Sequence, residues 1–234
     1  ALSESAIALY GYSGGGSVAL RAAELRQSYA PDIALSGTAI GGTPGDLVTL
    51  SNYATEPQTG IAGTGNFTMW LGFAALSRQY PEVFDSSELL TVEGQQLVAD
   101  LKSRCVYSAA LTGVYRPISE YFQPGKSLAT APGVLKVLQD NSLGQHIPDS
   151  PILWWHGVWD ELIPQSSVLP TVEKYWASGA DLRFYTSPIP EHLVNSTVGF
   201  PPAVAWISAV LRGLPPGPTF KADFAPLPEG FPGS

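Results

Sequence analysis

The chain has 234 residues, of which 44% are hydrophobic and 14% are charged, and its formal net charge is −8. This length and composition allow one α/β domain with an insertion, or two small domains. Because the balance is acidic and no basic run is present, we expect no nucleic-acid partner. The sequence shows no apolar run of the length needed to span a bilayer, so we expect no transmembrane helix.

The first predicted element is a buried parallel strand over Ala6–Tyr10, which is short and apolar. A glycine-rich turn follows and reads Gly11-Tyr-Ser-Gly-Gly15, which fits the pattern G-x-S-x-G. A helical pattern over Ser17–Ser28 comes next. Strand, tight turn and helix are the context of a nucleophile elbow, in which a serine stands at the carboxyl end of the strand. The sequence therefore predicts a nucleophile at Ser13, with an inert serine in a glycine-rich turn as the alternative.

The glycines of this turn have a steric purpose in such an elbow. We expect a Cβ at Gly11 or Gly15 to clash with the adjoining strand or helix, a clash that glycine avoids. The Ser13 hydroxyl is then expected near a helix N-terminus, whose free N–H groups favour developing negative charge. We expect the backbone N–H of Gly14 to contribute to the oxyanion hole.

The middle of the chain predicts a helical insertion. A second strand over Asp32–Ile40 ends at the glycine-rich stretch 41–45, and residues 46–150 then show few Val- and Ile-rich runs suited to central strands. Helical patterns occupy Phe67–Tyr80, Ser87–Tyr107, Pro117–Phe122 and Ala131–Asp140. An insertion of this kind within an α/β sheet indicates a helical cap, and an ordinary all-α domain with a structural role is the alternative.

The α/β pattern resumes after the insertion. The expected order is a strand over Pro151–Gly157, a helix over Thr171–Ser178, a strand over Leu182–Thr186, a proline-rich loop over Ser187–Val194 and a helix over Ala203–Arg212. We expect four segments: a hydrolase core at 1–45, the cap at 46–150, further core at 151–213 and an irregular Pro/Gly-rich tail at 214–234.

A serine nucleophile needs a base, and in this kind of fold the order along the chain is nucleophile, acid, base. His192 is the only histidine after the last two predicted strands, so we choose it as the base. His146 lies in a polar segment at the end of the predicted cap. His156 precedes the candidate acid, and we expect its ring to hold the following loop in place.

The acid should lie in a loop at the carboxyl end of a strand, where the active site of an α/β sheet gathers. Asp160 satisfies this condition, with Glu161 as the second choice. Asp149 and Asp181 precede their strands and so lie at the wrong end of the sheet. The alternative for Asp160 is a loop-capping residue that hydrogen-bonds its own backbone.

Four stretches together resemble the fungal secretory lipases, in the family's order and approximate spacing. They are Gly11-Tyr-Ser-Gly-Gly-Gly16, Gly41-Gly-Thr-Pro44, Pro151-Ile-Leu-Trp-Trp-His-Gly-Val-Trp-Asp-Glu-Leu-Ile-Pro164 and Glu191-His192. The resemblance implies an α/β-hydrolase fold with an inserted helical cap and a Ser13–Asp160–His192 triad. It also implies extracellular hydrolysis of acylglycerols or other carboxylic esters. The family has a further N-terminal part that supplies the first sheet strands and an oxyanion-hole contribution.

We therefore expect a secreted serine ester hydrolase of the lipase kind that needs no cofactor. We expect no metal either, since no two histidines have ligand spacing. Its partners would be an ester or lipid substrate and a lipid–water interface. The cap would line an acyl tunnel with apolar side chains such as Met69, Trp70, Leu71 and Phe73. The alternatives are an esterase for small acetyl or phenolic esters, and a non-catalytic recognition module on a hydrolase scaffold.

Three further expectations concern the surroundings of this core. Asn66 and Asn195 begin N-x-[ST] sequons and are candidate glycosylation sites.

Ala6–Tyr10 is too apolar for an edge strand, because buried parallel strands read as continuous apolar runs. We therefore expect residues 1–234 to function only with an upstream segment of the same precursor. We also expect Cys105, the single cysteine, to form a disulfide with a cysteine in that segment, with a buried free thiol as the alternative.

Overall fold

The computed structural model describes residues 6–58, 60–189 and 191–222. The chain forms two compact units. Unit 1 consists of Ala1–Asp46 and Ser142–Ser234, and unit 2 consists of Leu47–Asn141. Unit 1 contains a sheet covered by helices, whereas the described part of unit 2 consists of helices and loops with one isolated β-bridge between Leu90 and Phe122.

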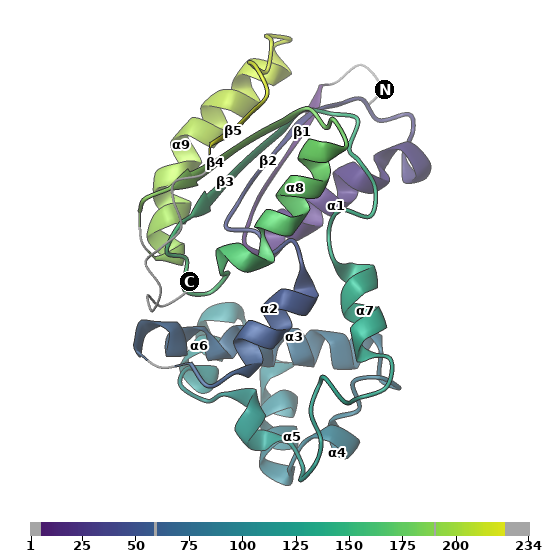
Figure 1. Cartoon of the computed structure of the whole chain (residues 1–234), viewed down its shortest axis with the longest axis vertical. Helices are drawn as coiled ribbons and strands as arrows, with labels where there is room; N and C mark the ends of the chain where they lie inside the picture. The colour runs from purple at the N-terminus through teal and green to yellow at the C-terminus, as the bar shows by residue number, and fades with distance from the viewer. Residues whose placement is uncertain (1–5, 59, 190, 223–234) are drawn as a thin grey trace. The chain divides into compact units, whose positions relative to one another are not determined.

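Unit 1 is built on a five-stranded sheet in which every neighbouring pair is parallel (Figure 1). Its strands, in spatial order, are β1 (Ile7–Tyr12), β2 (Leu35–Gly41), β3 (Ile152–Gly157), β4 (Leu182–Ser187) and β5 (Phe220–Ala222). The mostly parallel α/β sheet expected from the sequence is confirmed. Because all strands point the same way, the residues that follow β1, β3 and β4 lie along one edge of the sheet.

Helices cover both faces of this sheet (Figure 1). On one face lie α1 (Gly14–Tyr29) and α8 (Leu169–Ala177), the latter preceded by the short helix η3 (Gln165–Ser167), and on the other lies α9 (His192–Leu211). Successive strand residues point to opposite faces. The two tryptophans of β3 follow this rule: Trp154 packs against Tyr175 of α8, and Trp155 belongs to a core cluster with Ala203 of α9.

The last helix is longer than the sequence predicted. We expected a helix from Ala203, but α9 begins at His192 and runs through Pro201 and Pro202. Proline normally ends a helix because it lacks an N–H group. Here Asn195, Gly199 and Ala203, four residues apart, are buried on one face, and packing of such a face supplies most of a helix's stability.

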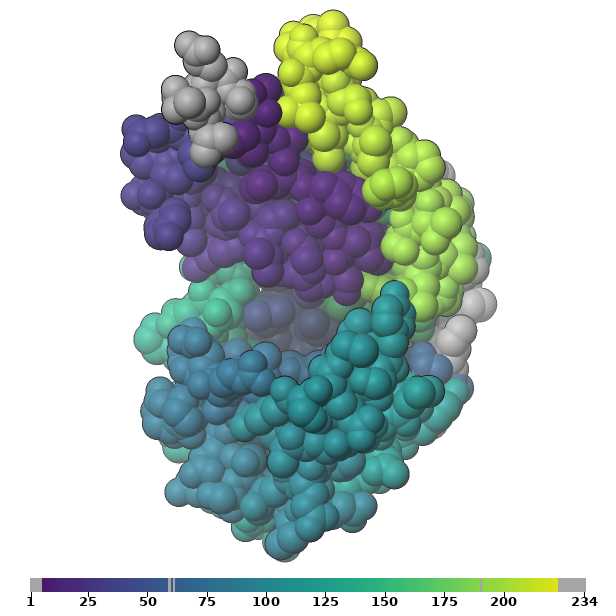
Figure 2. Space-filling model, turned by 180° about the vertical axis from the view of Figure 1, so that it is seen from behind, coloured from purple at the N-terminus to yellow at the C-terminus, as the bar shows by residue number. Residues whose placement is uncertain are grey.

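The expectation that no stretch is long and apolar enough to span a bilayer is also wrong for α9. By length and composition α9 could cross a membrane: an 18-residue window has a mean hydropathy of 1.3, and 22% of that window is buried. In the structure α9 packs on β1, β2 and β3. Figure 2 shows α9, in yellow-green, beside the purple N-terminal residues. Phe200 of α9 meets Tyr10 of β1 edge-on, with the ring centroids 5.6 Å apart.

The segment from Leu214 onward was expected to be irregular, and this is wrong for β5. Phe220 pairs with Arg183 and Ala222 with Tyr185 at the edge of the sheet. The buried Arg183 side chain also donates from Nε to the carbonyl oxygen of Gly217 at 3.1 Å, which ties this segment to β4. Three residues are too few to show a strand pattern in the sequence. The expected tail beyond Ala222 lies outside the described residues.

Unit 2 is a cluster of short helices around α3. Its elements are α2 (Leu47–Thr55), η1 (Gly60–Gly65), α3 (Asn66–Gln79), α4 (Ser86–Leu89), α5 (Val92–Leu101), α6 (Val106–Gly113), η2 (Ile118–Tyr121) and α7 (Val134–Asn141). The single pattern expected over Ser87–Tyr107 is divided among three of them. Asp85 and Thr91 each begin a new helix by accepting a backbone N–H, and Leu90 between them is extended.

The apolar side chains expected to line an acyl tunnel instead form the core of unit 2. Met69, Trp70 and Phe73 are buried in one hydrophobic cluster, and Leu71 is partly buried against it. Trp70 meets Tyr121 edge-on at 5.1 Å. Because these side chains fill the interior of the unit, the tunnel expected from them is not formed in this conformation.

The chain leaves unit 1 after Asp46 and returns to it at Ser142, earlier than the expected Pro151. The two crossing segments are tied together within unit 1. Leu143 donates its N–H to the carbonyl oxygen of Gly45 at 2.8 Å, and Gly144 donates to the buried Glu24 carboxylate at 2.5 Å. These bonds explain why the residues before β3 belong to unit 1.

Candidate active site

Ser13 lies at the tight turn between β1 and α1, in an unusual backbone conformation. Its φ is 55° and its ψ is −130°, and it is one of three non-glycine residues with positive φ among those described. Such a conformation costs on the order of 1–3 kcal/mol and persists where the surroundings impose it. The Ser13 N–H donates to the carbonyl oxygen of Gly41 at 2.9 Å, which fixes the turn to the end of β2.

The glycines around Ser13 only partly have the roles expected for them. A Cβ at Gly11 would lie 2.3 Å from the carbonyl oxygen of Gly15, so Gly11 is required. A Cβ at Gly15 would meet no described atom within 4 Å, so the clash expected there is wrong. The second close approach belongs to Gly16, whose Cβ would lie 1.9 Å from Thr43 Oγ1. The Gly-Gly-Thr-Pro stretch therefore supports the elbow.

The N-terminus of α1 leaves backbone donors beside Ser13. Gly16 and Ser17 donate their N–H groups to the Ser13 carbonyl oxygen, at 2.9 and 3.3 Å. Gly14 and Gly15 begin the helix, are exposed, and have no acceptor for their N–H groups within the helix itself. Their N–H groups are thus placed where a helix N-terminus attracts negative charge, and the oxyanion role of Gly14 stays a prediction.

Asp160 follows β3 and is almost fully buried, with 2% of its surface exposed. Its two carboxylate oxygens have different partners. Oδ1 accepts the N–H groups of Leu162 and Ile163 at 3.1 and 2.8 Å, and Oδ2 is 2.7 Å from Nδ1 of His192. Both alternatives weighed from the sequence are therefore present: one oxygen caps the loop, and the other holds the histidine ring.

His192 was expected in a loop but is the first residue of α9, where 3% of its surface is exposed. The preceding Glu191 has a φ of 78°, and its carboxylate accepts the N–H groups of Leu193 and Val194 at the start of the helix. The His192 N–H donates to Glu161 Oε2 at 3.1 Å. The second-choice acid thus binds the backbone of His192, while Asp160 binds its ring.

The environment of Glu161 disfavours its charge. Burial raises the pKa of its carboxyl group, and the negative charge of Asp160 raises it further. Hydrogen bonds from backbone N–H groups, including that of His192, oppose this shift. The carboxyl therefore holds its proton more tightly than an exposed glutamate does.

Tyr12 is a site residue that the sequence reasoning missed. Its ring lies 5.0 Å from the His192 ring, and its hydroxyl donates to the His192 carbonyl oxygen at 2.6 Å. Burial, together with the nearby Asp160, Glu191 and Glu161 carboxylates, raises the pKa of Tyr12. The available signal was its position in G-x-S-x-G, directly before the serine.

Three of the other histidines and aspartates weighed from the sequence make structural contacts instead. His156 Nε2 lies 3.0 Å from the carbonyl oxygen of Ile163, which confirms that this ring holds the Asp160 loop. His146 is exposed. Asp149 pairs with Arg26, and Asp181 pairs with Arg183 at 2.8 Å. Among the described residues, no three His, Cys, Asp or Glu side chains form a group that could hold a metal ion.

The structure thus joins Asp160 to His192 but not Ser13 to either. Within the described parts of the chain, neither the Ser13 hydroxyl nor Nε2 of His192 makes a hydrogen bond. Such bonds are often long in unliganded enzymes and shorten when substrate binds. The direct link between the Ser13 segment and His192 is made by Tyr12, the neighbouring residue.

The two expected glycosylation sites are buried, whereas the cysteine is exposed. Asn66 and Asn195 each have 1% of their surface exposed, which opposes glycosylation of either residue in the folded chain, because a glycan is bulky and lies at the surface. Cys105 is exposed and is a free thiol within the part of the chain described. Hydrogen bonds with Ser108 lower the pKa of its thiol. Its disulfide to a partner outside these residues stays a prediction.

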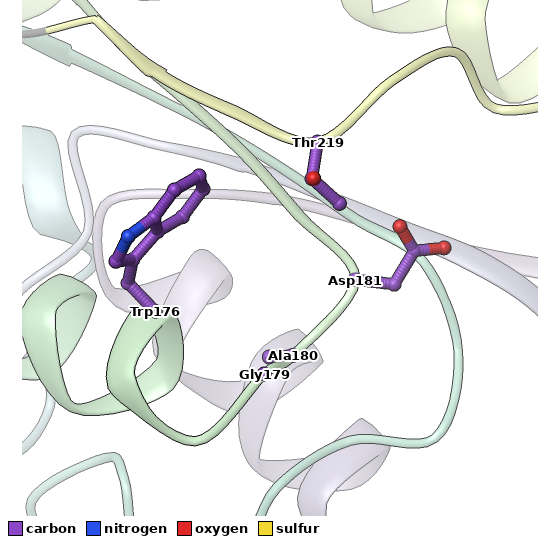
Figure 3. Close-up of a pocket in the computed structure, with 5 residues that line it drawn as sticks. All are labelled: Trp176, Gly179, Ala180, Asp181 and Thr219. Atoms are coloured by element: carbon purple, nitrogen blue, oxygen red, sulfur yellow. The ribbon is translucent and has the colours of Figure 1, made fainter.

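A pocket of about 430 Å³ lies away from these residues, at the start of β4 (Figure 3). It is lined by Trp176, Gly179, Ala180, Asp181 and Thr219. Because Asp181 precedes β4 and His192 follows it, the pocket lies at the opposite end of the sheet from the candidate site. Figure 3 shows the Asp181 carboxylate turned away from the Trp176 indole.

Known proteins resemble this chain over most of its length. "Lipase A" of Moesziomyces aphidis is 30% identical over 226 residues, which cover 92% of this chain and 47% of that protein. A "probable inactive lipase" of Mycobacterium tuberculosis is 29% identical over 211 residues, covering 89% of this chain and 46% of its own length. The chain therefore spans about half the length of these curated relatives.

Solved structures agree with the sequence comparison. The X-ray structure of Candida antarctica lipase A superposes with a TM-score of 0.83 at 25% identity, over 99% of this chain and 54% of that one. This likeness identifies the α/β-hydrolase fold expected from the sequence. The model of the secretory lipase family matches residues 2–218, and the chain belongs to that family.

Proposed function

We propose that this chain carries the catalytic triad of an extracellular serine ester hydrolase, a lipase that cleaves acylglycerol esters. The observation that carries the proposal is the buried hydrogen bond between Asp160 and the His192 ring. It lies at the carboxyl ends of the strands, the same end of the sheet as the strained Ser13 turn. Membership of the secretory lipase family supports the same reaction and an extracellular location.

In this mechanism Ser13 Oγ attacks the ester carbonyl carbon, and Nε2 of His192 accepts the hydroxyl proton. The same nitrogen then returns the proton to the leaving alcohol. Asp160 Oδ2, bound to Nδ1, holds the imidazole in the tautomer that leaves Nε2 free to act as the base. Water next attacks the acyl-enzyme with His192 again as the base, and the acid product leaves.

The negative charge that develops on the carbonyl oxygen needs donors already in position. Gly14 and its neighbour at the start of α1 supply backbone N–H groups for this purpose. A second donor would come from an upstream segment of the same precursor, which we also propose as the partner that completes the sheet beside β1. We also propose unit 2 as the helical cap of this hydrolase.

A second candidate is a non-catalytic module on the same scaffold. The observation in its favour is the relative described as a probable inactive lipase, at almost the same identity as the first. The presence of all three triad residues, with Asp160 bonded to the His192 ring, favours catalysis instead. A small-ester esterase is the third candidate and uses the same chemistry.

A fluorophosphonate probe separates the first two candidates. Applied to the full-length protein, it should label Ser13, as identified by peptide mass spectrometry, and Ser13→Ala should abolish both labelling and ester hydrolysis. Absence of labelling in a folded protein would support the non-catalytic module. Labelling at another serine would refute the assignment of Ser13.

A series of p-nitrophenyl esters separates the lipase from the small-ester esterase. Each methylene buried in an apolar site stabilises binding by about 0.8 kcal/mol. A lipase should therefore show kcat/KM rising from acetate towards medium or long acyl chains. A steady decline from acetate upward would support the esterase.

A further inference from the structure

We propose that Tyr12 is a positioning residue, whose hydroxyl holds His192 in register with the strand that carries Ser13. The inference rests on the triad proposed above and adds to it a contact that sets the base relative to the nucleophile. Tyr12 is the last residue of β1, and its partner His192 lies 180 positions later in the chain.

Three contacts hold His192, and they come from two different parts of the sheet. Asp160 binds the ring and Glu161 binds the backbone N–H, and both belong to the loop after β3. The third contact, from the Tyr12 hydroxyl to the His192 carbonyl oxygen at 2.6 Å, comes from β1. The first two contacts therefore fix the base to β3, and only Tyr12 among these three fixes it to the strand of the nucleophile.

The surroundings hold the Tyr12 ring in one place. Its centroid is 5.0 Å from that of the His192 ring and 6.0 Å from that of the Trp155 indole. Gly42 leaves the space that the ring needs: it has a φ of +52°, and a Cβ there would lie 2.6 Å from the Tyr12 hydroxyl oxygen. A residue with a side chain at position 42 would therefore displace the Tyr12 ring, and the positive φ there also favours glycine.

The hydroxyl is suited to act as a permanent donor. Burial and the carboxylates of Asp160, Glu191 and Glu161 disfavour a tyrosinate at this place, so the proton stays on the oxygen. The Asn195 amide, one turn along α9 from His192, partly opposes this shift in the pKa of Tyr12.

This placement matters because Ser13 and His192 share no hydrogen bond of their own within the described residues. Proton transfer in the first step needs their reacting atoms at hydrogen-bond distance, and a displacement of about 1 Å can cost roughly 100-fold in rate. Loss of a single hydrogen bond that limits such a displacement should have a smaller effect, about tenfold.

The test replaces Tyr12 by phenylalanine in the full-length protein, which keeps the ring contacts and removes only the hydroxyl. We expect kcat, expressed per site titrated with a fluorophosphonate, to fall about tenfold while KM stays within about twofold. The matched control is Tyr10→Phe, on the same strand. Its ring also packs on Trp155, at 6.2 Å, but its hydroxyl has no bond to His192, so both constants should stay near wild type.

Each outcome decides the point. A Tyr12→Phe kcat within twofold of wild type, a change confined to KM, or an equal loss in Tyr10→Phe would overturn the inference. A loss of stability alone would lower the number of titrated sites and leave kcat per site unchanged, which also counts against it. Ser13→Ala in the same assay tests the underlying proposal separately: if that variant stays active, the triad itself is wrong.

Discussion

Two turns of unit 1 each carry a candidate catalytic residue at the start of a helix, and they are stabilised in different ways. The turn of Ser13 and the turn of His192 both contain a non-glycine residue with positive φ, 55° at Ser13 and 78° at Glu191. His192 is buried and held by hydrogen bonds at its ring, its N–H and its carbonyl oxygen. Ser13 is half-buried, and Gly14 and Gly15 directly after it are exposed.

The difference shows which forces position each residue. The turn of His192 depends on polar side chains, so removal of one charge or hydrogen bond should change the base without changing the fold. The turn of Ser13 depends on close backbone approach at Gly11 and Gly16, so an added methyl group should disturb it where a lost polar group would not. The predictions below test this contrast.

Of the two turns, the polar one is expected to show the larger effect, from Asp160→Asn. Asparagine keeps an oxygen for the loop N–H groups but can present its NH₂ group to the His192 ring, which favours the wrong tautomer. An equivalent change in another serine hydrolase lowers kcat about 10⁴-fold. We expect a similar loss in kcat for ester hydrolysis, with little change in the thermal unfolding midpoint.

The matched control is Asp149→Asn, since Asp149 is an exposed aspartate that pairs with Arg26 on the same unit. Its kcat should stay near that of the wild type. Equal kcat values for the two variants would mean that Asp160 only caps its loop.

A smaller but still large effect is expected at the steric turn, from Gly11→Ala. The new Cβ would lie 2.3 Å from a backbone oxygen, which cannot move aside without opening the elbow. Overpacking of this kind costs about 1–3 kcal/mol, and the displaced nucleophile should lower kcat about 100-fold. Thermal unfolding and kcat per titrated site measure the two effects.

Gly15→Ala is the comparison for this change, because its Cβ would meet no described atom within 4 Å. Alanine also favours a helix over glycine by about 0.5–1 kcal/mol. We expect unchanged or slightly raised stability. Similar losses at Gly11 and Gly15 would show that the elbow is packed differently from the structure described.

The smallest effect is a pH dependence of stability at Glu161. Its pKa in the folded chain lies above the ordinary value of 4.5, so the folded state binds the proton more tightly than the unfolded state. The stabilising contribution is therefore complete at pH below 4.5 and is lost as pH rises through the folded-state pKa. Glutamine does not titrate and still offers an oxygen to the His192 N–H.

We therefore expect the unfolding midpoint of Glu161→Gln to rise relative to wild type as pH increases from acidic to neutral. Unfolding midpoints of both proteins across that range measure the difference. A constant difference, or one that moves in favour of the wild type, would contradict the assigned direction of the pKa shift.

The sequence predicted much of the site because its main residues follow simple rules. Ser13 stands in a local motif, and Asp160 and His192 each follow a strand in the order that the fold requires. A parallel sheet brings the ends of such strands to one edge, so their order along the chain was informative.

The missed features depend on contacts between distant segments. Tyr12 and His192 are 180 positions apart, and nothing in the local pattern of either residue predicts their hydrogen bond. The same holds for Gly16, which must lack a side chain because Thr43, from another loop, packs against it. The start of α9 was missed because Pro201 and Pro202 break the local helical pattern, while burial against the sheet maintains the helix.

The central claim is that Ser13 and His192 act together, and a double-mutant cycle tests it most directly. We expect Ser13→Ala and His192→Ala each to lower kcat by on the order of 10⁴–10⁶-fold, and the double variant to be no slower than either one, because members of a triad act as a unit. Losses that multiply in the double variant would show that the two residues contribute independently. That result would contradict the account.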